Sequence, residues 1–275
     1  MQLPVTSLEQ LTNDPLLRCF SGLRDRDVRA DGDLFVAEGE VVVRVLLASP
    51  RRRTRAVLFS QPMADKLSSL IPSGVKCYVA PEPLMQSIIG FPMHRGVLAL
   101  ADRGAGLSAT DVLPVTGPSF VVGLCGLTNH DNVGGVFRNA AAFGATAVLL
   151  DHATCDPLYR KAVRVSVGGT MVVPYAQLGD ERSVIDALVQ SGHEVLALSP
   201  RGELVIGVDP PPPTGRIALL LGAEGPGLSD AVMKRCRTAR VPMRGGWDSL
   251  NVAVTSGIAL AWLFASIRLP ATTTA

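Results

Sequence analysis

Residues 120–144 read FVVGLCGLTNHDNVGGVFRNAAAFG and decide the fold class. The stretch opens with a continuous apolar run at 120–125 and, after a polar turn, continues as an Ala-rich helical pattern at 133–143. A continuous apolar run predicts a strand covered on both faces, as in a parallel sheet with helices on either side. The arrangement recurs downstream, with apolar runs at 145–150, 194–198 and 217–221 and helical patterns at 159–166, 183–191 and 228–235. We therefore expect an α/β domain with a parallel sheet.

The chain before this segment predicts a second, smaller α/β unit. Short apolar runs alternate with helical patterns between residues 35 and 100. Residues 102–118 carry three glycines and two prolines with few large apolar residues, which interrupts both helical and strand periodicity. We expect an N-terminal domain at 1–101, a linker at 102–118 and a C-terminal domain at 119–275.

Composition excludes several classes of protein. With 47% hydrophobic residues the chain can bury a large core and is not disordered. Its 26 Lys and Arg against 24 Asp and Glu give a net charge of +2, which excludes a strongly polybasic nucleic-acid binder but leaves room for a local basic patch. Aromatic residues make up 5%, which argues against a protein that binds single strands by base stacking.

Cysteine and histidine spacing predicts neither a disulfide framework nor a metal site. The five cysteines form no C-x-x-C pair, and the four histidines lie far apart in the sequence. Glu9 and Asp14 interrupt the N-terminal stretch where a signal peptide would be apolar, so we expect a cytoplasmic protein. Residues 249–267 are uncharged, but Asn251, Thr255 and Ser256 favour a helix buried in protein over a membrane span.

The first of three chemically informative loops follows the apolar run at 120–125. Asn132 is a suitable helix cap, and Gly134 and Gly135 allow a backbone or a ligand to approach closely. Arg138 lies on a helix otherwise made of Ala, Val and Phe, and a buried arginine needs an anionic partner. That partner is either Asp131 or Glu224 in an internal ion pair, or a phosphate of a substrate.

The second loop, GAEGPGLS at residues 222–229, excludes two common nucleotide sites. Its glycines follow the order G-x-x-G-x-G, whereas a dinucleotide fingerprint needs G-x-G-x-x-G. A Walker A loop would need a lysine where Leu228 stands, so an NTPase is disfavoured. Glu224 repels a triphosphate but suits a ligand that carries positive charge.

The third loop, VPMRGGWDSLNVAV at residues 241–254, is read as a short strand that enters a Gly-Gly turn and then a long apolar helix. Backbone groups at such a turn are free to bind the polar edges of a ligand. Ser249 and Asn251 present side-chain hydrogen-bonding groups there, either to a ligand or as plain helix caps.

Together the three loops resemble the motifs of the SpoU family of RNA 2′-O-ribose methyltransferases, in the SPOUT class. The matching patterns are N-x-G-x-x-x-R-N-A-x-A-F-G, L-G-x-E-G-x-G-L and P-M-x-x-x-x-x-S-L-N-V, in that order between residues 119 and 267. Residues 35–39, FVAEG, also resemble the start of the N-terminal RNA-binding domain of rRNA-directed members. Gly246, Trp247 and Asp248 depart from the small residues usual before S-L-N, which affects the expected pocket shape.

The resemblance implies a deep trefoil knot in the C-terminal half, a homodimer whose active site is completed across the interface, and S-adenosylmethionine as the cofactor. The helix at 250–267 is a candidate for the dimer surface. By position, the family's cofactor contacts fall on Gly222, Gly225, Val241, Met243 and Leu250. Its catalytic or substrate-positioning residues fall on Asn132, Arg138, Glu224, Ser249 and Asn251.

These roles fit the chemistry of a weakly acidic ribose 2′-hydroxyl, which needs in-line placement and loss of a proton. A guanidinium is a poor base, so Arg138 is expected to bind the adjacent phosphate and to stabilise the developing alkoxide. Asn132 and Asn251 would orient the arginine and the ribose. Glu224 would favour the sulfonium or hold Arg138 in place.

RNA contacts are expected from two cationic runs. The densest comprises Arg51, Arg52, Arg53 and Arg55, and a second comprises Arg160, Lys161 and Arg164. Either run can instead be a solvated surface. Large-subunit rRNA is favoured over tRNA as substrate, and the rival functions are a non-catalytic RNA-binding protein with the same fold and a Rossmann-type oxidoreductase.

Overall fold

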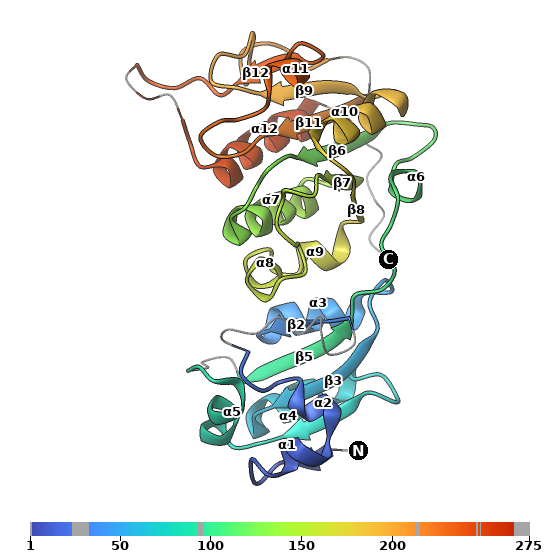
Figure 1. Ribbon diagram of the computed structural model, residues 1–275, viewed down its shortest axis with the longest axis vertical. Coiled ribbons are helices and arrows are strands. Elements are labelled where there is room, and N and C mark those ends of the chain that lie inside the picture. Colours follow the sequence, from blue (N-terminus) through green and yellow to red (C-terminus); the bar gives the residue numbers. More distant parts are fainter. Residues whose placement is uncertain are drawn as a thin grey trace. The chain divides into compact units, whose positions relative to one another are not determined.

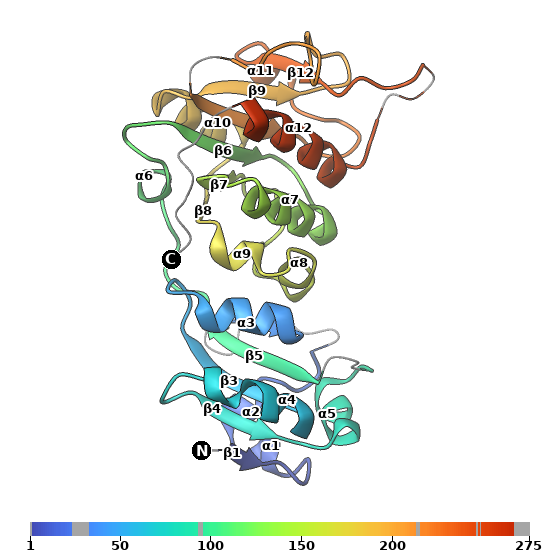
Figure 2. The ribbon, with the colours of Figure 1, turned by 180° about the vertical axis from the view of Figure 1, so that it is seen from behind.

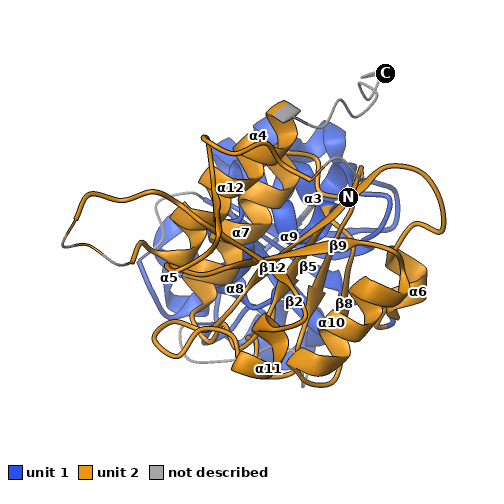
Figure 3. Ribbon diagram, turned by 90° about the horizontal axis from the view of Figure 1, so that it is seen from above, with its two compact units in different colours: residues 1–105, 157–172 blue, residues 106–156, 173–275 orange. Residues whose placement is uncertain are grey.

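The computed structural model describes residues 2–23, 33–92, 96–212, 215–245, 247 and 249–266. The chain forms two compact units (Figure 3). Unit 1 contains residues 1–105 and 157–172, and unit 2 contains residues 106–156 and 173–275. Residues 157–172 thus group with the N-terminal unit although the chain around them belongs to unit 2. The domain boundaries expected from the sequence stay a prediction.

Unit 1 is built on a five-stranded mixed sheet with the order β1-β4-β3-β5-β2. β1, β4 and β3 are parallel, whereas β5 runs antiparallel to both β3 and β2. The strands span Gln2–Pro4 (β1), Leu34–Glu38 (β2), Thr54–Phe59 (β3), Lys76–Val79 (β4) and Val97–Asp102 (β5). The helices are α1 (Gln10–Asn13), α2 (Pro15–Arg18), α3 (Glu40–Ala48), α4 (Gln61–Leu67), the 3-10 helix η2 (Ser68–Leu70), α5 (Glu82–Ile89), α8 (Arg160–Val165) and α9 (Gly169–Val172).

Unit 2 is built on a seven-stranded sheet in which every strand pair is parallel, as the continuous apolar runs predicted. Its order is β10-β12-β9-β11-β6-β7-β8 (Figure 1). The strands are β6 (Ser119–Leu124), β7 (Ala147–Leu150), β8 (Tyr175–Gln177), β9 (Glu194–Leu198), β10 (Leu204–Val205), β11 (Arg216–Leu221) and β12 (Arg237–Arg240). All six residues of β6 are buried, because helices cover both faces of the sheet.

Alternate residues of the central strands face two different helical layers. Phe120 and Val122 of β6 pack in one core with residues of α7 (His130–Ala142) and α12 (Val252–Ser266). Val121 belongs to the opposite core, with residues of α10 (Glu181–Gln190) and α11 (Asp230–Met233). Helix α6 (Ala109–Val112) falls within the expected linker and contributes Val112 to the second core. This three-layer arrangement is visible from both sides (Figures 1 and 2).

Helices α7 and α12 approach closely at a glycine. A Cβ atom built on Gly135 would lie 2.6 Å from the Cβ of Ala253, so a larger residue would force the helices apart. Asn139 secures the contact, because its Nδ2 donates to the Ala253 carbonyl (2.7 Å) and to the Ser256 hydroxyl (2.9 Å). The close approach that the sequence predicted at Gly135 is therefore made by a helix of the same chain.

Several local predictions were wrong in detail. α7 begins at His130 and its cap is Asn129, whose side chain accepts from the Asp131 amide, so Asn132 lies inside the first turn instead of capping it. The strand expected to begin at Val241 is β12, which ends at Arg240. α11 is shorter than the expected helix at 228–235. Ile267, the end of the expected apolar helix, lies outside the described residues, and among those described no helix is long and apolar enough to span a bilayer.

A buried histidine forms a hydrogen bond with the first residue of β6. His193 is 5% exposed and lies between two hydroxyls, with Nε2 2.7 Å from Ser119 Oγ and Nδ1 2.8 Å from Ser191 Oγ. Burial, together with the nearby positive charge of Arg216, lowers the pKa of His193 from 6.5 to about 4. The folded protein therefore holds this imidazole neutral at a pH where the unfolded chain protonates it.

The His193 pKa makes stability fall as the solution is acidified. Between pH 6.5 and about 4 the unfolded chain binds a proton that the folded chain does not, so the free energy of unfolding decreases. We expect wild type to lose about 1–2 kcal/mol more than His193→Gln between pH 7 and pH 5. Urea unfolding of both proteins at the two pH values measures this. An equal decrease in the free energy of unfolding of the two proteins would contradict the lowered pKa of His193.

Candidate functional site

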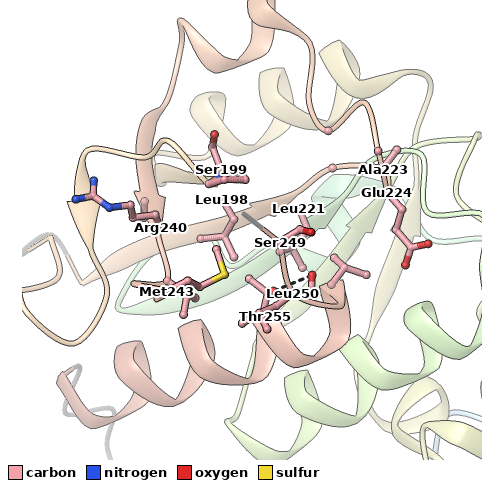
Figure 4. A pocket seen from close by; sticks show the side chains of 17 residues that line it. Leu198, Ser199, Leu221, Ala223, Glu224, Arg240, Met243, Ser249, Leu250 and Thr255 are labelled. Carbon is pink, nitrogen blue, oxygen red and sulfur yellow. Dashed lines mark hydrogen bonds between the residues drawn. The ribbon is translucent and has the colours of Figure 1, made fainter. Parts of the chain in front are cut away.

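A cavity of about 200 Å³ lies at the carboxyl ends of three adjacent strands of unit 2, β12, β9 and β11. Ligands of open parallel sheets bind at this edge, because the loops after neighbouring strands converge there. Figure 4 shows Leu198 and Met243 directed into the middle of the cavity, with Glu224 at one side and the Arg240 guanidinium pointing away.

The five residues expected to contact the cofactor all lie on the wall of this cavity. They come from the second and third loops and are Gly222, Gly225, Val241, Met243 and Leu250. Ser249 and Glu224 lie on the same wall. The fold therefore brings together residues that the sequence separates by almost thirty positions.

Gly222 shapes the loop that closes one side of the cavity. A Cβ atom built there would lie 2.5 Å from the backbone nitrogen of Leu228 and 2.6 Å from the carbonyl carbon of Gly227. The loop turns back on itself because the Gly227 amide donates to the Ala223 carbonyl (3.0 Å), and Gly225 and Gly227 adopt positive φ angles of 87° and 72°. These contacts explain why glycines recur in this loop. The apolar wall of the cavity suits an adenine ring, and the carboxylate of Glu224 suits the positive charge of a sulfonium.

Sequence reasoning missed one side of the cavity. Residues 198–200, which follow β9, line it, as do Ala239 and Arg240 at the end of β12. The run at 194–198 was predicted as a strand, and its carboxyl end next to Ser199 and Pro200 was the available signal. β12 was expected only from Val241 onward, because Arg237–Arg240 reads RTAR and lacks an apolar run.

A second cavity of about 250 Å³ adjoins the first. It lies at the carboxyl end of β6 and is lined by residues 126–129, Asn132, Ala223 and Glu224. Ala223 and Glu224 line both cavities. A group held in the second cavity would therefore lie beside one held in the first, on the other side of Glu224.

A chain of side-chain hydrogen bonds connects the three loops at this junction. Asn251 Nδ2 donates to Asn132 Oδ1 (2.8 Å), and Asn132 Nδ2 donates to Glu224 Oε1. Asn132 is buried, with 4% of its surface exposed, and both ends of its amide are used. The carboxylate at one end of the chain fixes the orientation of the Asn132 amide, because a carboxylate can only accept.

Asn251 takes the capping role, which is one of the two that the sequence left open. Its Oδ1 accepts from the amides of Ala253 (2.9 Å) and Val254 (3.2 Å) and thereby caps α12. Its Nδ2 is left to contact Asn132. The cap thus holds the amide in position for the junction between the cavities.

Arg138 does not make the internal ion pair that one of the two sequence interpretations expected. It is exposed on α7 and has no ion-pair or hydrogen-bond partner in the described part of the chain, so the expected internal pair with Asp131 or Glu224 is absent there. It lines neither cavity. Arg138 follows Asn132 by six positions, about 240° around a helix, which places the two side chains on different faces. Glu224 therefore contacts Asn132 and does not hold Arg138.

The first cationic run divides into two kinds of arginine. Arg52 donates to the Arg103 carbonyl and lies over the Phe35 ring, and Arg55 pairs with Asp102 at 3.3 Å. Arg51 and Arg53 are exposed. Two of the four cations are thus engaged within unit 1, and the other two are directed to solvent.

The second cationic run is also largely engaged within unit 1. Arg160 pairs with the buried carboxylate of Glu38 (2.8 Å) and lies over the Phe91 ring, and Arg164 approaches Glu38 at 3.8 Å. Lys161 is exposed. Because a buried carboxylate is costly without a cation, the two arginines stabilise Glu38 whether or not RNA is present.

Two further expectations concern the third loop and metals. Trp247 is 76% exposed and does not line the cofactor cavity, so its bulk leaves that cavity open. Gly246 and Asp248 lie outside the described residues.

Within the described ranges, no three His, Cys, Asp or Glu side chains gather in a way that could hold a metal ion.

Comparison with known proteins assigns this site to a family. The model of the SpoU rRNA methylase family matches residues 119–261, which include all three loops. The chain belongs to this family. The resemblance inferred from the three motifs is confirmed, and with it the expected enzyme class, a methyltransferase, and S-adenosylmethionine as the cofactor.

Individual relatives are similar over most of their length. An uncharacterized tRNA/rRNA methyltransferase from Mycobacterium tuberculosis is 40% identical over 90% of this chain and 88% of its own. A 23S rRNA (guanosine-2′-O-)-methyltransferase, RlmB, from Ralstonia nicotianae is 31% identical over 72% of this chain and 80% of its own. The structure of an AdoMet-bound rRNA methyltransferase from Sinorhizobium meliloti matches with a TM-score of 0.76 at 24% identity, covering 95% of this chain and 97% of the other, and supports the fold.

Replacing Gly222 by Ala is expected to lower the affinity for S-adenosylmethionine at least tenfold. The new Cβ would collide with the backbone of residues 227 and 228, which cannot move without reshaping the cavity wall. A calorimetric titration measures the dissociation constant. Gly245→Ala is the matched control, because nothing lies within 4 Å of a Cβ there. Equal affinity of Gly222→Ala and wild type would refute this account of the loop.

Proposed function

We propose that this SpoU-family protein transfers a methyl group from S-adenosylmethionine to a ribose 2′-hydroxyl of RNA, with 23S rRNA as its substrate. The observation that carries the proposal is the junction of the two cavities, where Glu224 separates the cofactor cavity from a polar cavity suited to a ribose. The name of the Ralstonia relative supports both the ribose and the rRNA. Because the mycobacterial relative is named tRNA/rRNA methyltransferase, tRNA is the alternative substrate.

In this proposal the chain's own residues place the hydroxyl and remove solvent from around it. S-adenosylmethionine, when bound, supplies an electrophilic methyl group on a positively charged sulfur. Asn132 and Asn251 orient the ribose, because their amides are fixed by each other and by the cap of α12. The Glu224 carboxylate fixes Asn132 and favours positive charge beside it. The hydroxyl proton leaves to a phosphate or to water.

Arg138 contributes to the site from a second copy of the chain. It lies on the exposed side of α7, and the neighbouring helix α12 exposes the apolar side chains of Val254 and Ile258, which are four positions apart. Exposed apolar side chains at helical spacing favour burial against a partner, and a symmetric homodimer satisfies this with one surface used twice. The partner's Arg138 would bind the substrate phosphate and stabilise the developing alkoxide.

The remaining parts of the proposal concern RNA binding and topology. Unit 1 binds RNA, and the exposed Arg51 and Arg53 contact its phosphates. Arg52 and Arg55 instead bond to the Arg103 carbonyl and to Asp102 within unit 1. The knot expected from the family lies in the C-terminal half, where the second and third loops hold the cofactor. A ribosomal substrate favours a cytoplasmic enzyme.

Replacing Arg138 by Ala is expected to lower kcat about 100-fold or more while the affinity for S-adenosylmethionine stays within about twofold of wild type, because the lost charge acts on the transition state. Transfer of tritiated methyl groups to 23S rRNA and to tRNA, with mapping of ribose methylation, gives the rate and the substrate. Arg235→Ala is the control, since Arg235 is an exposed arginine paired with Asp186.

Mixing two impaired variants, at an S-adenosylmethionine concentration too low to load Gly222→Ala, tests the contribution of the partner. If Arg138 acts across a dimer, Arg138→Ala mixed with Gly222→Ala regains about a quarter of wild-type activity, because half of the dimers hold one intact site. No regain in a mixture that forms dimers would show that Arg138 acts within its own chain. Wild-type protein that methylates neither RNA would overturn the proposed function.

Replacing Arg51 and Arg53 together by Gln is expected to reduce the slope of log K against log salt for RNA binding by about 1.4–1.8, because each phosphate contact contributes about 0.7–0.9. Arg55→Gln is the control, since this guanidinium already pairs with Asp102. Binding of a 23S rRNA fragment at several salt concentrations measures the slope. An unchanged slope in the double variant would assign Arg51 and Arg53 to a solvated surface.

A further inference from the structure

The loop that lines the second cavity is hydrogen-bonded to two buried side chains that follow β7. The amide of Gly126 donates to Asp151 Oδ1 (3.0 Å), and the amide of Leu127 donates to Thr154 Oγ1 (3.2 Å). Asp151 and Thr154 are 5% and 3% exposed. Both amides belong to the loop that continues to Thr128, Asn129 and the start of α7, so the pair determines where that wall of the cavity lies.

Asp151 and Thr154 also fix each other. Asp151 Oδ1 accepts from the Thr154 amide (2.8 Å) and lies 2.6 Å from the Thr154 hydroxyl, which donates its proton to the carboxylate. With its proton used in this way, the hydroxyl oxygen is available to accept from Leu127. No cation pairs with Asp151 in the described part of the chain, so the carboxylate is stabilised by these hydrogen bonds and serves no ion pair.

The loop is confined on its other side as well. Gly126 has a φ of +72°, and a Cβ built on it would lie 3.1 Å from the Cβ of Ala223, which lines both cavities. The Cys155 amide donates to the Leu127 carbonyl (2.8 Å). Residues 126 and 127 are therefore held between the segment after β7 and the loop after β11.

We propose that Asp151 and Thr154 are positioning residues for the acceptor ribose, which they control through the loop at 126–129. The inference rests on the proposed function, since it takes the second cavity to be the ribose site. Neither side chain lines the cofactor cavity, so their removal separates acceptor placement from cofactor binding. Displacement of the wall misplaces the hydroxyl, and a misplacement of about 1 Å can cost 100-fold in rate.

Thr154→Val, compared with Thr146→Val, is the deciding experiment. Thr146 Oγ1 accepts from the Phe120 amide at 3.2 Å, so both variants remove an amide-to-threonine bond of the same length between β6 and the segment around β7, at opposite ends of these strands. Thr154→Val also removes the bond that the hydroxyl donates to Asp151 Oδ1 (2.6 Å), which is part of the pair under test. We expect Thr154→Val to lower kcat for RNA about tenfold or more, with the dissociation constant for S-adenosylmethionine within twofold of wild type. Thr146→Val should leave both values within twofold of wild type, and Thr154→Ser should restore kcat.

Asp151→Asn keeps the shape of the side chain and tests the same pair should Thr154→Val not fold. The hydrogen bonds to Oδ1 lose their charge, so kcat should fall threefold or more at unchanged cofactor affinity. Equal kcat values for the two threonine variants, a wild-type rate for Asp151→Asn, or a tenfold loss of cofactor affinity in Thr154→Val would each overturn this inference while wild-type turnover upholds the proposed function. A wild type that methylates no ribose would overturn both.

Discussion

The hydrogen-bonded chain from Asn251 through Asn132 to Glu224 is the constraint on which the site depends. Each residue follows a different part of the sheet, and the chain forms only because parallel strands bring their carboxyl ends to one edge. It has a fixed polarity, since the carboxylate must accept and the buried amide must turn its nitrogen toward it. The structure thus holds two asparagines in one orientation, which lowers the entropic cost of placing a substrate.

The sequence predicted the layers of unit 2 because long apolar runs identify buried parallel strands. The run at 194–198 coincides with β9, and three others differ from the observed strands by one or two residues. β8 and β10 were missed and β12 was expected only from Val241 onward, because pairing with neighbouring strands, rather than hydrophobicity, stabilises these strands. The cofactor wall was predicted through the resemblance to a family, whereas Ser199 and Pro200 could be placed only by tertiary structure.

Charge was harder to interpret from sequence than apolar patterning. Arg138 was expected to be buried and paired, since its helix is otherwise made of small apolar residues, yet it lies on the exposed side of α7. Arg160 and Arg52, both in cationic runs, instead engage a buried carboxylate and a backbone carbonyl. A run of cations does not reveal which members meet a protein partner, because those partners lie more than 50 positions away.

The grouping of residues 157–172 with the N-terminal unit has a consequence for dissecting the protein. The polypeptide passes between the two units at 105/106, 156/157 and 172/173. Cleavage at the first of these points would leave an amino-terminal fragment without α8 and its partners for the buried carboxylate of Glu38. Neither unit is one continuous segment of the polypeptide, so expression of residues 1–105 alone would leave the Glu38 carboxylate buried without its arginine partners.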